Sequence, residues 1–211
     1  MRMTKFEHAC VRLEDHDRTL VLDPGGFSDA AGALSGADAV LITHEHADHI
    51  DAVALRAAAA ANPALAVYAP AVVAASFADL AVTVMAAGEE FDAAGFHVET
   101  FGGQHALIHP SIPVVANIGC LIDASLYHPG DSFTVPARPV GTLLVPIHAP
   151  WSKVAEVIDF VVSVRAPQAF QIHDALLNDT GLGLVEGHVS RIGAEFGTAY
   201  RHLATGETVT V

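Results

Sequence analysis

The sequence holds few cysteines and few positive charges, and each shortage removes a class of protein. Two cysteines, Cys10 and Cys120, are too few for a disulfide framework and form no C-x-x-C pair. They indicate a reducing compartment and buried thiols that bind no metal. Only 10 Lys and Arg residues oppose 24 Asp and Glu residues, and the formal net charge of −14 excludes nucleic acid as a favoured partner.

Long apolar runs and linkers are missing as well. No uninterrupted apolar run reaches the roughly 18 residues needed to cross a bilayer, and the polar opening of residues 1–8 is not typical of a signal peptide. No low-complexity tract or repeat interrupts the chain. With 52% hydrophobic and 16% charged residues, the sequence predicts one well-packed domain over residues 1–211, in the cytoplasm and without a membrane partner.

Strand and helix patterns are mixed along both halves of the chain. We expect the main strands at residues 4–13, 18–22, 39–42, 66–68, 98–101, 117–126, 143–147 and 169–172, and a closing pair of strands around Gly206 within 198–211. We expect helices at residues 51–61, 70–80, 154–164 and 184–196. This order predicts an α/β fold of layered sheets covered by helices.

One stretch, residues 43–49, concentrates the chemistry. His44, His46, Asp48 and His49 follow a short apolar strand and precede a helix. Residues two apart point to nearly opposite sides of a helix but to the same side of an extended segment. His44 and His46 can therefore share a metal ion only on an extended loop at a strand end. Three histidines and an aspartate within six residues are too dense for an ordinary solvent-facing loop.

His105, Asp131 and His173 each follow a later strand-like segment. Any one of them alone would be read as a turn or surface residue. Together with the first cluster, they predict ligands gathered at one edge of the sheets. Five imidazoles and two carboxylates suit zinc, with manganese or iron as the alternatives. Seven ligands exceed the need of one tetrahedral ion, so we expect two divalent ions that share a carboxylate.

The order His44-x-His46-x-Asp48-His49, then His105, Asp131 and His173, resembles the metal signature of the metallo-β-lactamase superfamily. The resemblance implies a four-layer αββα metallo-β-lactamase-type sandwich. It extends back to Asp23, which is similar to an early aspartate that supports the ligand loop. The small size, the opening residues 7–11 and the turn at residues 127–131 resemble the ascorbate-6-phosphate-lactonase-like branch.

The resemblance also implies how the ligands divide. His44, His46 and His105 would hold one metal, Asp48, His49 and His173 the other, and Asp131 would bridge them. Asp131 stands where the main zinc β-lactamases have a cysteine, and His46 stands where flavodiiron oxidoreductases have a glutamate. We therefore expect neither a β-lactam substrate nor a redox di-iron role.

The expected activity is hydrolysis of an ester, lactone or phosphoester bond in a small metabolite. A hydroxide shared by two metals would be the nucleophile, since no Ser or Cys nucleophile motif is present. Asp48 would accept the proton, a role that the resemblance implies. The alternative is a metal-binding protein of this fold without turnover, which serves as a sensor or interaction module.

Residues around the ligands carry further hypotheses. Trp151 and Lys153 follow the strand at 143–147, so they could bind substrate by stacking and by ion pairing; equally, Trp151 could cap the core and Lys153 face solvent. His8, His109 and His128 are candidate hydrogen-bond partners of the ligands. The sequence leaves the oligomeric state open.

Overall fold

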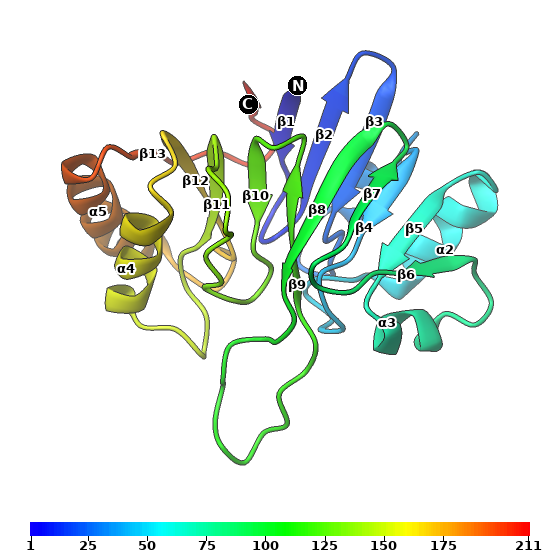
Figure 1. The fold of residues 1–211 in the computed structure, drawn as a ribbon, viewed down its shortest axis with the longest axis horizontal. Helices are drawn as coiled ribbons and strands as arrows, with labels where there is room; N and C mark the ends of the chain where they lie inside the picture. The colour runs from blue at the N-terminus through cyan, green and yellow to red at the C-terminus, as the bar shows by residue number, and fades with distance from the viewer.

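Two sheets of seven strands each lie face to face in the computed structural model, which describes residues 1–211 (Figure 1). The first sheet has the spatial order β14 (Thr208–Thr210), β1 (Arg2–Lys5), β2 (Val11–Asp15), β3 (Arg18–Leu22), β4 (Ala39–Leu41), β5 (Ala66–Ala69) and β6 (Val82–Val84). The second has the order β13 (Ala199–Arg201), β12 (Gln168–Ile172), β11 (Thr142–Pro146), β10 (Leu126–His128), β9 (Ile118–Ile122), β8 (Phe96–Gly102) and β7 (Glu90–Ala93).

Helices cover the outer face of each sheet. Those on the first sheet are α1 (Ala30–Leu34), α2 (Ala52–Ala61) and α3 (Ala71–Ser76); those on the second are α4 (Val154–Val164) and α5 (Asp179–Glu195). Figure 1 shows the two helical layers at opposite ends of the view, with the sheets between them. None of these helices combines the length and apolar character needed to span a bilayer. The predicted four-layer αββα sandwich is confirmed.

Alternation along the strands creates the layers. Leu20 and Leu22 of β3 point into a core between the two sheets, whereas Val21 points into a second core beneath the helices of the first sheet. Leu41 and Val40 of β4 divide in the same way. Successive strand side chains face opposite sides, so a strand that is apolar at every position contributes to two cores at once.

Strand direction brings several loops to one edge. In the first sheet β3 to β6 are parallel, and in the second β10 to β13 are parallel. β8 and β10 both pair antiparallel with β9, so β8 runs in the same direction as β10. The carboxyl ends of β8, β10, β11 and β12 therefore share one edge, and the loops that follow them meet there.

Several expected elements differ from the structure. The strand expected at 117–126 is two antiparallel strands, β9 and β10, because residues 123–125 form a turn. The strand expected at 4–13 is two strands, because residues 6–10 leave the ladder and His8 adopts a left-handed backbone conformation (φ 57°). The last helix begins at Asp179, five residues before the expected start, where Asn178 caps it by accepting a hydrogen bond from the Gly181 amide. Two glycines near the start of the helix lower its helix propensity, so the sequence pattern did not indicate the first turn.

The two closing strands do not pair with each other. β13 joins β12 in the second sheet, whereas β14 joins β1 in the first. Gly206, at φ 81°, forms the turn by which the chain crosses between the sheets. The turn predicted at Gly206 is confirmed, but the predicted pairing of the two closing strands with each other is wrong. Local turn chemistry does not specify which distant edge a strand meets.

The ligand-rich loop packs closely on the turn that follows β3. The Gly26 amide donates to the Ala47 carbonyl, and the Asp51 amide donates to the Pro24 carbonyl. A Cβ atom on Gly25 would lie 1.7 Å from the carbonyl oxygen of Asp48. Only glycine therefore allows the two backbone segments to approach this closely.

Gly25→Ala should consequently displace the loop and destabilise the protein. Forced overpacking costs about 1–3 kcal/mol, equivalent to a fall of roughly 2–12 °C in Tm for a chain of this size. Thermal unfolding followed by circular dichroism measures the effect. Gly183→Ala is the matched control, because a Cβ there meets nothing within 4 Å and should leave Tm unchanged or raise it. An unaltered Tm in Gly25→Ala would contradict the close packing.

Candidate metal centre

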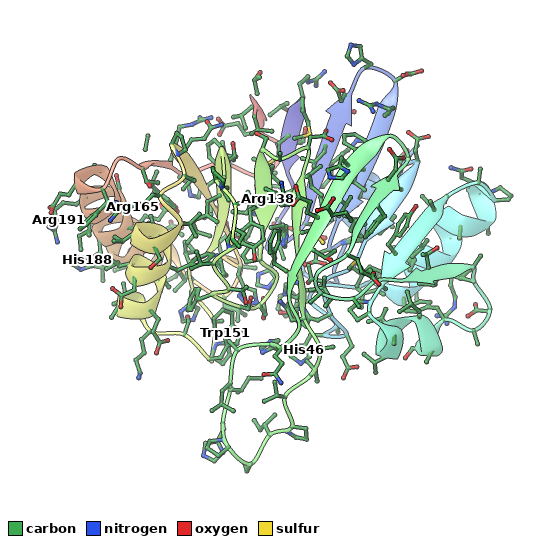
Figure 2. The ribbon with its side chains drawn as sticks, viewed as in Figure 1. His46, Arg138, Trp151, Arg165, His188 and Arg191 are labelled. Atoms are coloured by element: carbon green, nitrogen blue, oxygen red, sulfur yellow. The ribbon has the colours of Figure 1, made fainter.

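The structure brings all seven predicted ligands together at the edge where the strands end. Their ligand atoms form two groups, each with all atoms within 4.8 Å of one another. One group contains His44, His46, His105 and Asp131, and the other contains His8, Asp48, His49 and His173. In Figure 2, His46 and Trp151 mark this edge, at the base of the long loop between β8 and β9.

Asp131 lies between the two groups. Its Oδ2 atom is 3.2 Å from His105 Nε2 and 3.9 Å from His44 Nε2, on the side of the first group. Oδ2 is also 3.2 Å from His173 Nε2, and Oδ1 is 3.0 Å from His49 Nε2, both in the second group. A carboxylate within reach of both groups has the geometry of a bridging ligand.

Hydrogen bonds fix which ring nitrogen of three histidines faces Asp131. The Nδ1 atoms of His49, His105 and His173 each lie 2.6–2.7 Å from an oxygen that can only accept, so each Nδ1 carries the proton. These oxygens are Asp23 Oδ2, Ala106 O and His148 O. The Nε2 lone pairs then converge on a carboxylate, and these buried Nε2 atoms have no hydrogen-bond partner. Lone pairs facing a carboxylate repel unless a cation or proton lies between them, so the residues fit divalent metal.

The ionisation of the cluster follows the same logic. Burial, together with the charge of His49, holds the pKa of His44 well below its usual value, and burial with the charge of His105 lowers the pKa of His46. Burial would also lower the pKa of His49 and His173, but the neighbouring carboxylates outweigh it. They raise the pKa of His49 well above its usual value and that of His173 to about 9.

The carboxylates respond in the opposite direction. Burial would raise the pKa of Asp131, yet His49, His105 and His173 hold it well below the usual range. Burial likewise opposes the fall in the pKa of Asp48, which hydrogen bonds with His173 and His8 bring about. Both carboxylates are therefore ionised at neutral pH, the state that binds metal.

Asp23 organises the loop from beneath. Its fully buried carboxylate accepts hydrogen bonds from the Thr43 amide, the Thr43 hydroxyl and His49 Nδ1, all at 2.7 Å. The Thr43 hydroxyl in turn accepts from His44 Nδ1 at 3.0 Å, which directs His44 Nε2 toward the cluster. Asp23 thus sets the orientation of two rings, in the supporting position that the sequence predicted.

His8 is close enough to be a ligand but is oriented as a donor. Its Nδ1 accepts from the Ala175 amide at 3.4 Å, so Nε2 carries the proton and donates to Asp48 Oδ2 at 3.1 Å. Burial lowers the pKa of His8 despite the bond to Asp48, which keeps the ring neutral. The hydrogen-bonding role expected of His8 therefore fits better than metal ligation.

His128 and His109 differ in their placement. His128 is fully buried; its Nε2 donates to the Ala9 carbonyl and its Nδ1 accepts from the Gly130 amide, so it holds the turn that carries Asp131. His109 is exposed on the loop between β8 and β9 and hydrogen-bonds Ser111 at 2.7 Å. The structure does not bring His109 to the cluster.

Two residues that the sequence reading missed support the cluster. Asn117 is fully buried; its side chain accepts from the Asp131 amide and donates to the Pro129 carbonyl. Lys5 is buried, donates to the His8 carbonyl and pairs with Asp174 at 3.2 Å. Strand alternation placing Lys5 on the same face as Met3 could have signalled its burial, whereas nothing local distinguishes Asn117.

Trp151 reaches the cluster, and Lys153 does not. The Trp151 indole Nε1 donates to Asp131 Oδ2 at 3.0 Å, and its ring packs edge-on to His105 and Phe133. Lys153 is the N-cap residue of α4, and its exposed side chain lies 3.7 Å from Glu156. It lines a neighbouring hollow, outside the one above the cluster.

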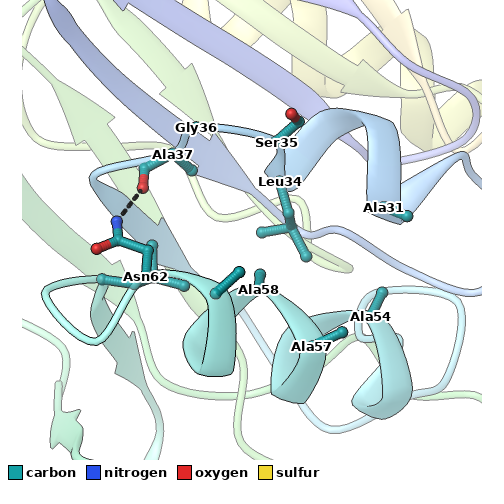
Figure 3. Close-up of a pocket in the computed structure, with 11 residues that line it drawn as sticks. Ala31, Leu34, Ser35, Gly36, Ala37, Ala54, Ala57, Ala58 and Asn62 are labelled. Carbon is teal, nitrogen blue, oxygen red and sulfur yellow. Dashed lines mark hydrogen bonds between the residues drawn. The ribbon is translucent and has the colours of Figure 1, made fainter.

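A cavity of about 290 Å³ lies directly over the cluster and includes Asp48, Asp131 and Trp151 in its lining. A larger hollow of about 450 Å³ lies between α1 and α2 (Figure 3). Alanines such as Ala54 and Ala58 line the larger hollow. The Asn62 side-chain amide donates a hydrogen bond to the Ala37 carbonyl beside them. That hollow has no titratable side chain, so it offers no catalytic group.

The fold and the cluster together define an αββα protein with two groups of residues that could each hold a metal ion. A family model described as "Beta-lactamase superfamily domain" matches residues 2–173. The chain therefore belongs to the β-lactamase superfamily, as the sequence predicted.

Two relatives refine this assignment. Protein Rv0786c of Mycobacterium tuberculosis is 38% identical over 199 residues, which cover 91% of this chain and 92% of the relative. A UPF0173 metal-dependent hydrolase of Xanthobacter autotrophicus is 31% identical over 155 residues, or 63% of this chain and 62% of the relative. The second similarity supports the small hydrolase branch.

Solved structures agree on the fold. Igni18, a metallo hydrolase from the archaeon Ignicoccus hospitalis, has a TM-score of 0.75 at 17% identity. The match covers 99% of this chain and 97% of the Igni18 chain. The metallo-β-lactamase fold protein YhfI from Bacillus subtilis has a TM-score of 0.73 at 14% identity. This match covers 96% of this chain and 91% of the YhfI chain. At such identities the similarity concerns the fold alone.

Metal binding should release protons from His49 and His173. At pH 7.5 both rings of chelator-treated protein carry a second proton, since the pKa of His173 is raised to about 9 and that of His49 well above its usual value. Only neutral imidazole binds metal, so zinc should displace about two protons per chain. Calorimetric titrations in buffers of different ionisation enthalpy count them.

The same shifts predict how the metal-free protein responds to pH. A raised pKa contributes stability that is present below about pH 6.5, the ordinary value, and is lost as pH rises through about 9. Zinc-loaded protein should show the reverse trend on the acid side, because protons then compete with metal. Zinc binding without proton release at pH 7.5 would refute this ionisation pattern.

Proposed function

We propose that the protein is a binuclear metal-dependent hydrolase that cleaves an ester, lactone or phosphoester bond of a small metabolite. His44, His46 and His105 would hold one ion, Asp48, His49 and His173 the other, and Asp131 would bridge them. Zinc is the first choice, with manganese or iron as alternatives. Bound divalent ions supply a water that ionises near neutral pH and a positive charge that polarises the substrate oxygen.

One observation carries the proposal. The Nε2 atoms of His49, His105 and His173 are buried, have no hydrogen-bond partner and converge on the Asp131 carboxylate. With neutral rings and no metal these atoms would be unpaired, and each unpaired buried polar atom costs about 1–3 kcal/mol. Their position around a cavity supports a site that binds cations and substrate.

The position of Asp48 supports its proposed role as proton acceptor. Its side chain is the most exposed of the carboxylates in the cluster, at 21%, and it lines the cavity. His8 donates to Asp48 Oδ2, which fixes the carboxylate orientation while the other oxygen stays available. The lowered pKa keeps Asp48 ionised at neutral pH. Transfer of a proton to so weak a base would require a water whose own pKa is lowered by bound metal.

A cytoplasmic location is part of the proposal. Cys10 and Cys120 are both free and buried, and burial raises the pKa of the Cys10 thiol to about 12. Thiols held in this way are compatible with a reducing compartment and contribute no nucleophile.

A substrate screen tests the reaction class. Zinc- or manganese-loaded protein is assayed against lactones, thioesters and phosphodiesters, with chelator-treated protein as the blank. Metal-dependent turnover of at least one class supports the hydrolase. Tight binding of two ions without turnover of any class would favour the sensor or interaction module.

Asp131→Asn should reduce activity more than about 100-fold and lower metal content from about two ions per chain toward one. Loss of an outer hydrogen-bond partner costs about 10–100-fold in affinity or activity, and a bridging ligand should cost more. Metal analysis by mass spectrometry provides the second readout. Asp17→Asn, in the exposed hairpin turn, is the control for a lost aspartate charge. Two tightly held ions and normal turnover in Asp131→Asn would rule out the bridge.

A further inference from the structure

Apolar side chains surround the mouth of the cavity over the cluster. Phe27, Ile108 and Leu176 line it and remain 47%, 37% and 51% exposed. They come from three loops far apart in sequence: one after β3, one between β8 and β9, and one after β12. Pro150 and Trp151 complete this apolar rim. Exposed hydrophobic residues that converge on one opening are typical of a ligand-binding surface.

Positive charge is missing from the same lining. None of the ten Lys and Arg residues of the chain lines this cavity. Lys5 is buried and paired with Asp174, and Lys153 lies outside the cavity beside Glu156. A phosphate or carboxylate carried by the substrate away from the reacting bond would have no cationic partner.

We propose that this cavity accepts an uncharged ester or lactone whose acyl portion is a short apolar chain lying against the rim. The inference rests on the proposed metal-dependent hydrolysis and narrows its substrate class. The reacting carbonyl would lie over the metal cluster at the cavity floor, and Phe27, Ile108 and Leu176 would cover the acyl chain.

Two physical terms favour this class over an anionic metabolite. Each methylene moved from water onto an apolar wall tightens binding by up to about fourfold. An anionic tail would instead lose hydration against the same wall, in a protein with a formal net charge of −14. The volume of about 290 Å³ lies near the lower end of ligand pockets, which suits a short chain.

Hydroxamates test the substrate class without requiring turnover, because the hydroxamate group chelates divalent metal and leaves its tail in the cavity. Three probes are titrated calorimetrically into zinc-loaded protein: acetohydroxamate, hexanohydroxamate, and the six-carbon monohydroxamate that ends in a carboxylate. Hexanohydroxamate should bind at least about tenfold tighter than acetohydroxamate. It should also bind at least about tenfold tighter than the carboxylate-ended probe.

Variants assign the effect to the rim. Ile108→Ser and Leu176→Ser should each reduce the preference for hexanohydroxamate over acetohydroxamate by about threefold or more, without changing zinc content. Leu184→Ser, at an exposed position on α5, is the matched control and should leave the preference unchanged. Lys153→Met should not alter binding of the carboxylate-ended probe.

The outcomes separate the two levels of the proposal. Equal binding of the long and short probes, or tighter binding of the carboxylate-ended probe, overturns the apolar substrate class and leaves the hydrolase intact. Weaker binding of the carboxylate-ended probe to Lys153→Met would also overturn the apolar substrate class. Failure of all three probes to bind zinc-loaded protein, with zinc confirmed by metal analysis, overturns the proposed function and this inference with it.

Discussion

The Asp131 carboxylate, surrounded by imidazole lone pairs, is the interaction on which the rest of the structure depends. Four histidine Nε2 atoms lie 3.0–3.9 Å from its oxygens. Hydrogen bonds on the far side of the rings prevent three of these imidazoles, when they are neutral, from turning a donor toward it. Such a cluster is stable only when positive charge compensates it. The fold therefore has to supply both the convergence and a site for that charge.

Convergence is achieved by rigid supports in both sheets. Asp23, after β3, fixes Thr43 and His49, whereas Asn117, before β9, fixes the Asp131 amide. The Ile118 amide donates to the Thr43 carbonyl and so joins the two sheets at this edge. Ligands borne by separate sheets keep their spacing only if such cross-links hold the edges together. The buried polar groups near the cluster are consequently part of the site.

The sequence predicted the fold class and the residues that gather at the edge because both leave local signals. The density of His44, His46 and His49 beside a short apolar strand is visible without any structure, and α2 ends where Asn62-Pro63 requires. The left-handed backbone of His8 and the burial of Asn117 leave no such signal, since each depends on contacts more than ten residues away. Pairing of β13 and β14 with different sheets was missed for the same reason.

Trp151 connects the two halves of the site. The sequence left open whether its ring stacks on substrate or caps the core, and stacking on substrate stays a prediction. Its N–H donates to Asp131, its ring packs on Phe133, and it also lines the cavity. A molecule bound against this ring would contact the residue that hydrogen-bonds Asp131. Trp151 therefore joins the apolar rim of the cavity to the carboxylate at the centre of the histidine cluster, so the shape of both depends on where this one ring lies.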